Sequence, residues 1–183
     1  PHPHRGIGTV TYMLNGAFAH EDSTGSKGKM SPGDRQWRET GRGIIHSEMP
    51  AMSDGKLLGF QLWINMPASM KMNKPKYEYI KSNQKTKFED EDKKINLIAG
   101  KFENIEGPVK GHNVEPIYFD IELNEDKKID LRVPETHNSF VYLLKGDLKI
   151  GSQNHKKVND STLVLLEKGS ELEIIANKKS KFL

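Results

Sequence analysis

Short runs of β-branched and aromatic residues, each stopped by glycine, proline or asparagine, limit most strongly what this chain can fold into. Residues 9–14 (TVTYML) end at Asn15-Gly16, a dipeptide typical of hairpin turns, and residues 60–66 (FQLWINM) alternate in polarity up to Pro67. Similar runs return later in the chain, over residues 95–99, 117–123, 140–144 and 162–166. Short strands separated by such turns predict an all-β fold, either a sandwich or a barrel.

Residues 69–95 differ from their surroundings. Their first part contains lysine and methionine without alternation, and residues 84–94 are dominated by charge. We therefore predict a linker over 69–95, between one domain over 1–68 and a second over 96–183. A weak internal repeat supports this division, because residues 9–16 match residues 139–146 at a tyrosine, a leucine and a glycine. Two copies of one β domain explain the match best, and chance similarity between two strand–turn units is the alternative.

Composition excludes several classes of protein. The absence of cysteine rules out disulfide scaffolds, iron–sulfur clusters and thiol catalysis. The 28 basic residues against 25 acidic ones give a net charge of +3, too balanced to predict direct nucleic-acid binding. No apolar run is long enough for a membrane span, and no targeting signal is visible. We expect a cytoplasmic protein, or a nuclear one if the source is eukaryotic. Because the chain begins on Pro1 and ends on strand-like residues, we also expect it to be truncated at both ends.

Two pairs of polar residues with i, i+2 spacing carry the candidate chemistry. They are His2 with His4, and His46 with Glu48. Residues two apart in a strand point to the same face, about 6.5–7 Å apart, so two such strands side by side would surround one point with four ligands. Three imidazoles and a carboxylate suit Fe, Mn, Ni, Co, Cu or Zn. The alternative is a chance His-x-His pair at a disordered terminus.

The order of motifs is informative as well. The segment PHPHRG at residues 1–6 is followed by TVTY at 9–12, PGDRQW at 32–37, TGRGIIHSEMP at 40–50 and QLWIN at 61–65. This series resembles the pirin family of the cupin superfamily. The resemblance is dense over residues 1 to about 67 and looser beyond them.

The resemblance implies a bicupin, in which two cupin-type β-barrels are joined by a linker. In that family only the amino-terminal barrel binds metal, usually iron, so one divalent ion, most often Fe(II), would be held by His2, His4, His46 and Glu48. Some members resemble quercetin 2,3-dioxygenase, which opens a flavonol ring with O2. Others act without catalysis, as iron-dependent co-regulators of a transcription factor or a metabolic enzyme.

Two hypotheses for function follow from this resemblance. As a dioxygenase, the protein would bind a flavonol-like molecule and O2, with Glu48 as the catalytic base. As a redox sensor, it would report the charge of the iron to a protein partner through the loops at residues 25–29 and 35–42. Oxygen consumption with quercetin after iron loading discriminates between the two.

The resemblance also has limits that can be stated by residue. Shifting the first histidine pair onto the second domain reaches Arg132 and Pro134, and the counterpart of His46 is Phe182, so we expect no second metal site. Cupins usually carry a glutamate where this chain has Gly8. Because Glu48 is the carboxylate ligand in this resemblance, we expect the metal site to survive, but without a second carboxylate that could act as base or orient a ligand.

The remaining histidines and the tryptophans invite plainer interpretations. Surface or turn positions are favoured for the four histidines outside the pairs, and core packing is favoured over substrate stacking for both tryptophans. These residues are His20, His112, His137, His155, Trp37 and Trp63.

Overall fold

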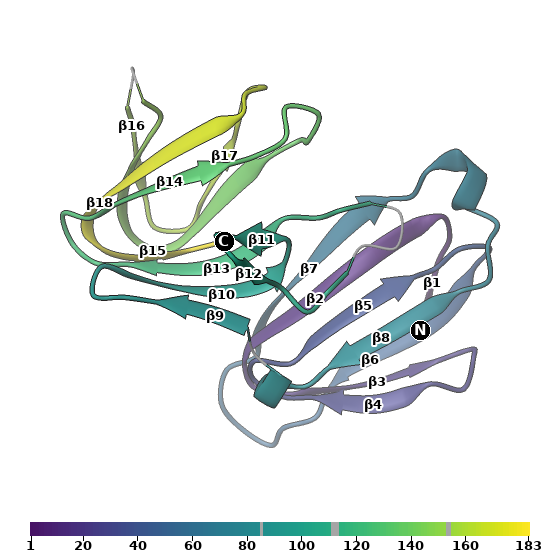
Figure 1. Cartoon of the computed structure of the whole chain (residues 1–183). Coiled ribbons are helices and arrows are strands. Elements are labelled where there is room, and N and C mark those ends of the chain that lie inside the picture. The colour runs from purple at the N-terminus through teal and green to yellow at the C-terminus, as the bar shows by residue number, and fades with distance from the viewer. Residues whose placement is uncertain (85, 111–113, 153–154) are drawn as a thin grey trace. The chain divides into compact units, whose positions relative to one another are not determined.

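The computed structural model describes residues 1–183 except 85, 111–113 and 153–154. The chain is almost entirely β, as predicted, and forms two compact units (Figure 1). The N-terminal unit comprises residues 1–85 and 108–115, and the C-terminal unit comprises 86–107 and 116–183. Within the described residues, no helix is long and apolar enough to cross a membrane.

The described residues of the N-terminal unit form eight strands and two short 3-10 helices. In chain order they are β1 (His2–His4), β2 (Ile7–Asn15), β3 (Phe18–Asp22), β4 (Lys27–Met30), β5 (Arg35–Glu39), β6 (Ile44–Pro50), β7 (Leu58–Asn65), η1 (Ala68–Met70), β8 (Lys76–Ile80) and η2 (Ser82–Gln84).

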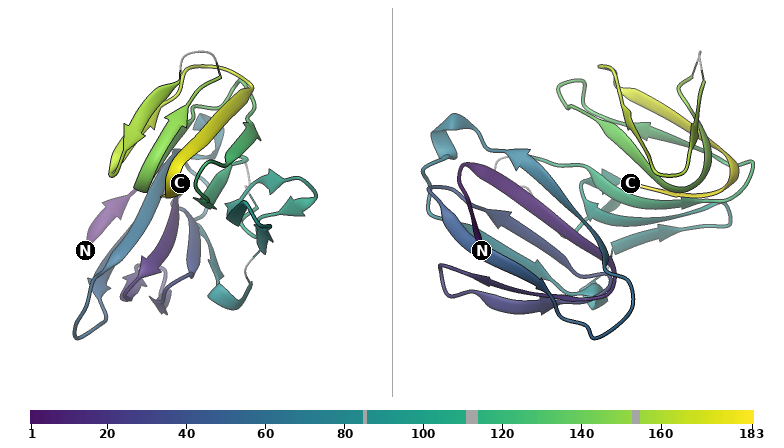
Figure 2. Two further views of the ribbon diagram at one scale, coloured as in Figure 1. Left: turned by 90° about the vertical axis from the view of Figure 1, so that its left-hand side faces the viewer. Right: turned by 180° about the vertical axis from the view of Figure 1, so that it is seen from behind.

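These strands form two four-stranded antiparallel sheets that face each other (Figure 2). One has the order β1-β6-β3-β4 and the other the order β7-β2-β5-β8. Side chains from β5 and β7 reach β6 of the opposite sheet, since Arg38 bonds His46 and Gln61 bonds Glu48. The interior between the sheets is therefore the place where the two polar pairs lie.

The turn at Asn15-Gly16 differs from the predicted hairpin. Its two flanking strands, β2 and β3, belong to different sheets, so the turn carries the chain from one sheet to the other. Gly16 has the positive φ that the dipeptide predicts. The local turn was therefore predicted correctly and the pairing of its strands was wrong, because a dipeptide does not encode which sheet the next strand joins.

In the C-terminal unit, the residues that the structure describes form ten strands. They are β9 (Thr86–Glu89), β10 (Lys93–Ala99), β11 (Lys101–Phe102), β12 (Ile105–Glu106), β13 (Tyr118–Leu123), β14 (Lys128–Arg132), β15 (Phe140–Ile150), β16 (Lys156–Asn159), β17 (Thr162–Leu165) and β18 (Glu171–Phe182). Eight of them form one sheet with the path β16-β15-β18-β13-β10-β9, in which β14 also pairs with β18 and β17 with β15.

Two long strands of this sheet each pair with different neighbours at their two ends. Strand β15 pairs with β17 through residues 140–143 and with β16 through 147–150, and β18 likewise has different partners at its two ends (Figure 1). Register shifts between Leu143 and Leu148 mark the bend. Gly146 lies there with φ +120°, and a Cβ on it would come within 2.1 Å of the Ser180 hydroxyl. Only glycine fits this bend without displacing β18.

The boundaries of the units differ from the predicted ones. The segment expected to be a linker contributes β8 to the N-terminal unit, where it pairs with β5, and β9 and the start of β10 to the C-terminal unit. Its charged residues belong to strands with one solvent-facing side. In β9, for example, Lys87 and Glu89 are exposed while Thr86 and Phe88 are half-buried. High charge was therefore a poor sign of a connector.

Candidate metal centre

Strands β1 and β6 are antiparallel neighbours that bring the two histidine-containing motifs together. His2 lies directly opposite His46, and His4 lies opposite Ile44. His2 is exposed, whereas His4 and His46 are 6% and 1% exposed. The site is therefore reached from the side of His2 and has its deepest ligand in β6.

The three imidazoles converge through the same ring atom. The Nε2 atom of His2 lies 2.8 Å from Nε2 of His4 and 2.8 Å from Nε2 of His46. Ligand nitrogens about 2.0–2.1 Å from a metal, at right angles to each other, would be about 2.9 Å apart. These two spacings therefore fit ligands at adjacent positions of an octahedral ion. Within the described residues, these three form the one group of histidine or acidic side chains close enough to share a metal.

Burial and charge keep the two inner imidazoles neutral. Burial, the Arg38 cation and the neighbouring histidines lower the pKa of His46 to about 3. Burial also lowers the pKa of His4, with the charges of His2 and Arg38 acting in the same direction. A neutral imidazole has a lone pair for a metal, so these residues are prepared for ligation at neutral pH.

Glu48, the fourth predicted ligand, lies beside the histidine cluster and not within it. Its Oε1 atom is 3.8 Å from Nδ1 of His46 and 4.0 Å from Nη1 of Arg38. The side-chain amide of Gln61 donates to Oε1 at 3.2 Å, which holds the carboxylate on this side of His46. The structure thus brings three of the four predicted ligands together, and a change of Glu48 rotamer is needed to add the fourth.

A buried polar network that the sequence analysis missed lines the interior behind the cluster. Arg38 donates through Nη1 to Nδ1 of His46 and through Nη2 to Oε1 of Gln36, the latter at 2.9 Å. Gln36 donates to the Tyr77 hydroxyl at 2.6 Å, which in turn contacts Nε2 of His20 at 2.8 Å. The sequence did contain one sign of this network: Arg38 and Gln36 are two residues apart in a strand-like segment and therefore share a face.

The prediction for His20 was wrong. This residue is 4% exposed, faces the interior from β3 opposite Glu48, and bonds Tyr77. Alternation along β3 decides its place, since Phe18, His20 and Asp22 are all buried. His137 lies in a turn and His155 bonds Glu173 at the surface, as predicted. His112 lies outside the described residues.

The two tryptophans have opposite environments. Trp37 is 2% exposed, which confirms its predicted core position. Trp63 is 61% exposed, so core packing was the wrong prediction there. Its ring centroid is 5.1 Å from that of His4, at a near-perpendicular angle. Trp63 therefore offers an open aromatic surface next to the inner ligand.

The loop between β5 and β6 positions the start of β6, the strand that carries His46. Gly41 has φ +48°, and a Cβ on it would lie 2.0 Å from the carbonyl oxygen of Asn73. Its own carbonyl accepts from the Gly6 N–H at 2.8 Å, which ties this loop to the β1–β2 connection. The glycine-rich turn preceding His46 thus joins the two motifs that carry the histidines.

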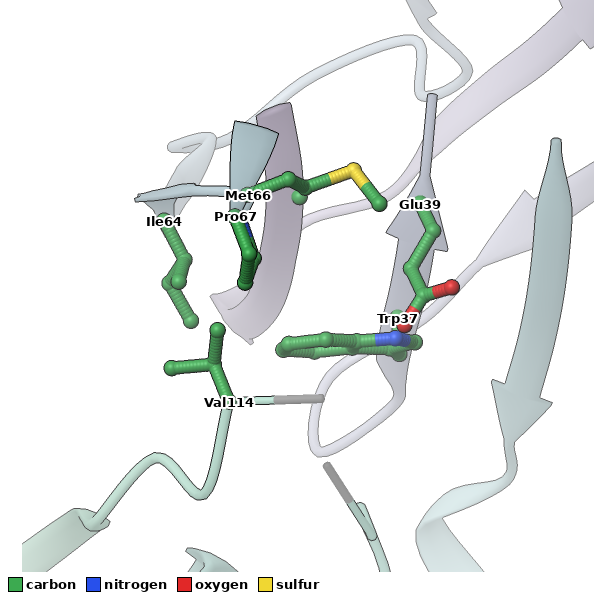
Figure 3. Close-up of a pocket in the computed structure, with 7 residues that line it drawn as sticks. Trp37, Glu39, Ile64, Met66, Pro67 and Val114 are labelled. Atoms are coloured by element: carbon green, nitrogen blue, oxygen red, sulfur yellow. The ribbon is translucent and has the colours of Figure 1, made fainter. Parts of the chain in front are cut away.

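A small pocket lies on the other face of the β7-β2-β5-β8 sheet. Figure 3 shows the Trp37 indole forming one wall, with Ile64, Pro67 and Val114 around it. Its volume is only about 10 Å³, roughly that needed for one water molecule. This pocket is too small for a flavonol, so it adds nothing to the candidate metal centre.

Comparison with known proteins identifies the family. The pirin family model matches residues 1–64, and the model described as the pirin C-terminal cupin domain matches residues 118–183. A Thermoplasma acidophilum protein, named as a candidate quercetin 2,3-dioxygenase, is 32% identical over 201 aligned positions, which cover all of this chain and 76% of the relative. The chain belongs to the pirin family.

Other pirin relatives support the same assignment. A Pseudomonas aeruginosa protein, also named as a candidate quercetin 2,3-dioxygenase, is 36% identical over 94% of this chain and 62% of its own length. The crystal structure of quercetin 2,3-dioxygenase from Acinetobacter baumannii is 29% identical, with a TM-score of 0.87, over 99% of this chain and 64% of that one. The chain spans 62–64% of the length of the first three curated relatives it matches.

A side chain at position 8, where cupins usually carry a glutamate, would point away from the histidine cluster. Across β2 and β5, Gly8 pairs with Glu39 and Thr9 pairs with Arg38. Because Arg38 faces the metal centre, position 8 faces the opposite side, and a Cβ there would lie 3.7 Å from the Trp37 ring. In this register a glutamate at position 8 would not point at the histidines, so the expectation that Gly8 removes a nearby carboxylate was wrong.

Proposed function

We propose that the N-terminal unit of this pirin holds one divalent transition metal, most often Fe(II), and that the protein is a dioxygenase of the quercetin 2,3-dioxygenase type. Mn, Ni, Co, Cu and Zn also suit nitrogen and oxygen donors. The observation that carries the proposal is the convergence of three Nε2 atoms, two pairs of them 2.8 Å apart, beside the buried cation Arg38. The names of the relatives supply the substrate class.

The donor set supports a metal and leaves room for substrate. His2, His4 and His46 would hold the ion, with Glu48 as the fourth ligand after it turns from Gln61. Four protein ligands leave two positions of an octahedral ion for small molecules. When bound, the metal would act as a Lewis acid that lowers the pKa of a coordinated hydroxyl and would supply the redox chemistry for O2.

The chain's own residues would bind and orient the flavonol. Trp63 presents an exposed ring beside His4, on which a planar aromatic molecule can pack. Glu48 is the candidate base for the flavonol hydroxyl, because its Oε1 atom lies 3.8 Å from Nδ1 of His46. Gln61 would hold Glu48 ready, since its amide bonds both carboxylate oxygens, at 3.2 and 3.4 Å.

The test begins with metal content. Protein purified without a histidine tag is analysed for bound metals, loaded with iron and assayed for oxygen consumption with quercetin. We expect one ion per chain and turnover in the loaded protein. Glu48→Gln is expected to retain metal and lose turnover, while the matched surface variant Glu89→Gln retains both.

Two results would contradict the proposal at different levels. Absence of bound metal after loading would remove the metal centre. Metal binding without oxygen uptake would remove the dioxygenase and favour the non-catalytic sensor, whose partner affinity should then depend on the oxidation state of the iron. Unchanged activity in Glu48→Gln would show that this residue is not the base.

A further inference from the structure

Arg38 is a fully buried cation in contact with a candidate metal ligand. Its exposed fraction is 0%, and it lies on β5, across the interior from β6. Nη1 donates to Nδ1 of His46 and Nη2 donates to Oε1 of Gln36. Its Nε atom has no hydrogen-bond partner in the described part of the chain. Burial of a charge with an unsatisfied donor costs stability, which calls for a functional reason.

Two carboxylates lie near the histidine that Arg38 contacts: Glu48 beside it on β6, and Asp22, which pairs with His46 across β3 and β6. Glu48 Oε1 is 4.0 Å from Nη1. Asp22 is 7% exposed, and its Oδ1 accepts from the backbone and hydroxyl of Thr24 at 2.8 and 2.6 Å and from the Ser26 N–H at 3.3 Å. The other oxygen of Asp22 has no hydrogen-bond partner among the residues described. The buried charges therefore nearly balance before any metal binds.

A divalent ion would change this balance. If the imidazoles are neutral, the charged groups are the two carboxylates of Glu48 and Asp22, the guanidinium of Arg38 and the divalent ion. Together they carry one net positive charge in a poorly hydrated interior. A further ligand that carries a negative charge is favoured there over a neutral one of similar size. This preference for an anionic ligand depends on Arg38, because the ion and the two carboxylates alone have no net charge.

Ligation also changes what Arg38 can bond. Arginine has only donors, so Nδ1 of His46 accepts here and, in the neutral ring, Nε2 carries the proton. Use of Nε2 as a ligand requires the proton on Nδ1, where it faces another donor. An N–H of Arg38 is then left without its acceptor, and an anion at the centre can take that place.

We propose that Arg38 makes this metal centre select anionic ligands, so that its substrate is an oxyanion such as an ionised hydroxyl or a carboxylate. The inference rests on the proposed metal site and adds a positioning residue that no ligand motif contains. Gln36 and Tyr77 hold the guanidinium in place, through the 2.9 and 2.6 Å bonds that connect Arg38 to Gln36 and Gln36 to Tyr77.

The experiment compares a charged and a neutral probe on cobalt-loaded protein. Azide and imidazole are titrated at about pH 8, where imidazole is neutral, and binding is followed by the visible absorption of Co²⁺. We expect Arg38→Met to bind azide about tenfold more weakly and imidazole within about twofold of the wild type. Arg38→Lys, which keeps the charge, should recover most of the azide affinity. Arg42→Met removes one exposed charge and should change neither affinity.

The outcomes separate this inference from the proposed function. If the wild-type protein binds no cobalt, both fail. If cobalt binds and Arg38→Met leaves the ratio of azide to imidazole affinity unchanged, the inference alone is wrong. An equal loss of both affinities would mean that Arg38 only maintains the structure, which also overturns it. Should Arg38→Met fail to fold, Arg38→Gln removes the same charge with a polar side chain.

Discussion

The two units have the same kind of fold and opposite interiors. Of the buried polar and charged side chains in the described residues, all but Asp120 and Ser180 belong to the N-terminal unit. The C-terminal unit instead packs one continuous apolar cluster of fourteen buried residues, whereas a buried apolar cluster of the N-terminal unit consists of Met13, Phe18 and Met30. The same kind of β fold thus has a mostly polar interior in one unit and an apolar interior in the other.

The difference arises from which residues alternate inward. In β5, Gln36 and Arg38 face the interior, and in β6 His46 does the same. In β15 the inward positions are taken by Val141, Leu143 and other aliphatic residues. Polar inward residues cost burial energy that aliphatic ones would contribute. We therefore expect the N-terminal unit to depend on its ligand and the C-terminal unit to depend on its packing.

The largest expected effect is loss of the metal in His46→Ala. His46 is the most buried of the three converging imidazoles, so its removal leaves only the two imidazoles of β1 and the Glu48 carboxylate to hold the ion. We expect metal affinity, measured by calorimetry with Ni²⁺ or Co²⁺, to fall by more than about 100-fold. His155→Ala, at an exposed position of the other unit, is the control and should bind metal normally. Equal affinities in the two variants would show that the cluster is not a metal site.

The counterpart in the C-terminal unit is Leu143→Ala. Leu143 is fully buried in the apolar cluster, so the variant should lose about 2–5 kcal/mol of unfolding free energy in that unit. Far-UV circular dichroism reports this loss. Both tryptophans lie in the N-terminal unit, so tryptophan fluorescence should show an unchanged transition there. Unchanged metal affinity completes the test, and a shift of both transitions together would break the proposed independence of the two interiors.

Metal addition should stabilise one unit selectively. At a free Ni²⁺ concentration about 100 times its dissociation constant, binding to the folded state adds about 2.7 kcal/mol. We expect the thermal transition seen by tryptophan fluorescence to rise, and the remaining change in circular dichroism to stay where it was. An equal rise of both transitions would contradict the contrast between a ligand-dependent and a packing-dependent unit.

The fold class was predicted from local periodicity, and alternation predicted that the two members of each polar pair share a face. His2, His4 and His46 were joined into one ligand set by the resemblance to the pirin family, because their two motifs lie far apart in the sequence. Arg38, Gln36 and Tyr77 were missed because their meeting depends on which sheets face each other, and no pair spacing encodes that. The charged segment at 69–95 was misassigned for a similar reason, since the partner that makes β8 a strand, β5, is distant in sequence.

The smallest expected effect concerns Asp34, which holds three segments of the N-terminal unit together. It is 2% exposed and accepts from the Ser31 N–H at 2.9 Å, from the Ser82 N–H at 2.8 Å and from the Tyr79 hydroxyl. Burial raises the pKa of Asp34, but these hydrogen bonds and the charge of Lys81 outweigh it and hold the pKa below its ordinary value. Asp34→Asn should cost about 1–3 kcal/mol at neutral pH, because an amide N–H₂ faces donors that the carboxylate accepted.

The pH dependence of this contribution has a definite sign. A carboxyl group with a lowered folded-state pKa stabilises the fold fully above its unfolded value of about 3.9, and the stabilisation is lost as the pH falls through the folded pKa. The tryptophan-reported stability of the wild type should therefore decline below about pH 4, and Asp34→Asn should decline less because it lacks this term at every pH. The exposed Asp54→Asn variant should follow the wild type. If the stabilities of Asp34→Asn and the wild type decline in parallel as the pH falls, the hydrogen bonds to Asp34 do not lower its pKa in the folded state. The ionised Asp34 would then stabilise the N-terminal unit no more than a neutral amide does.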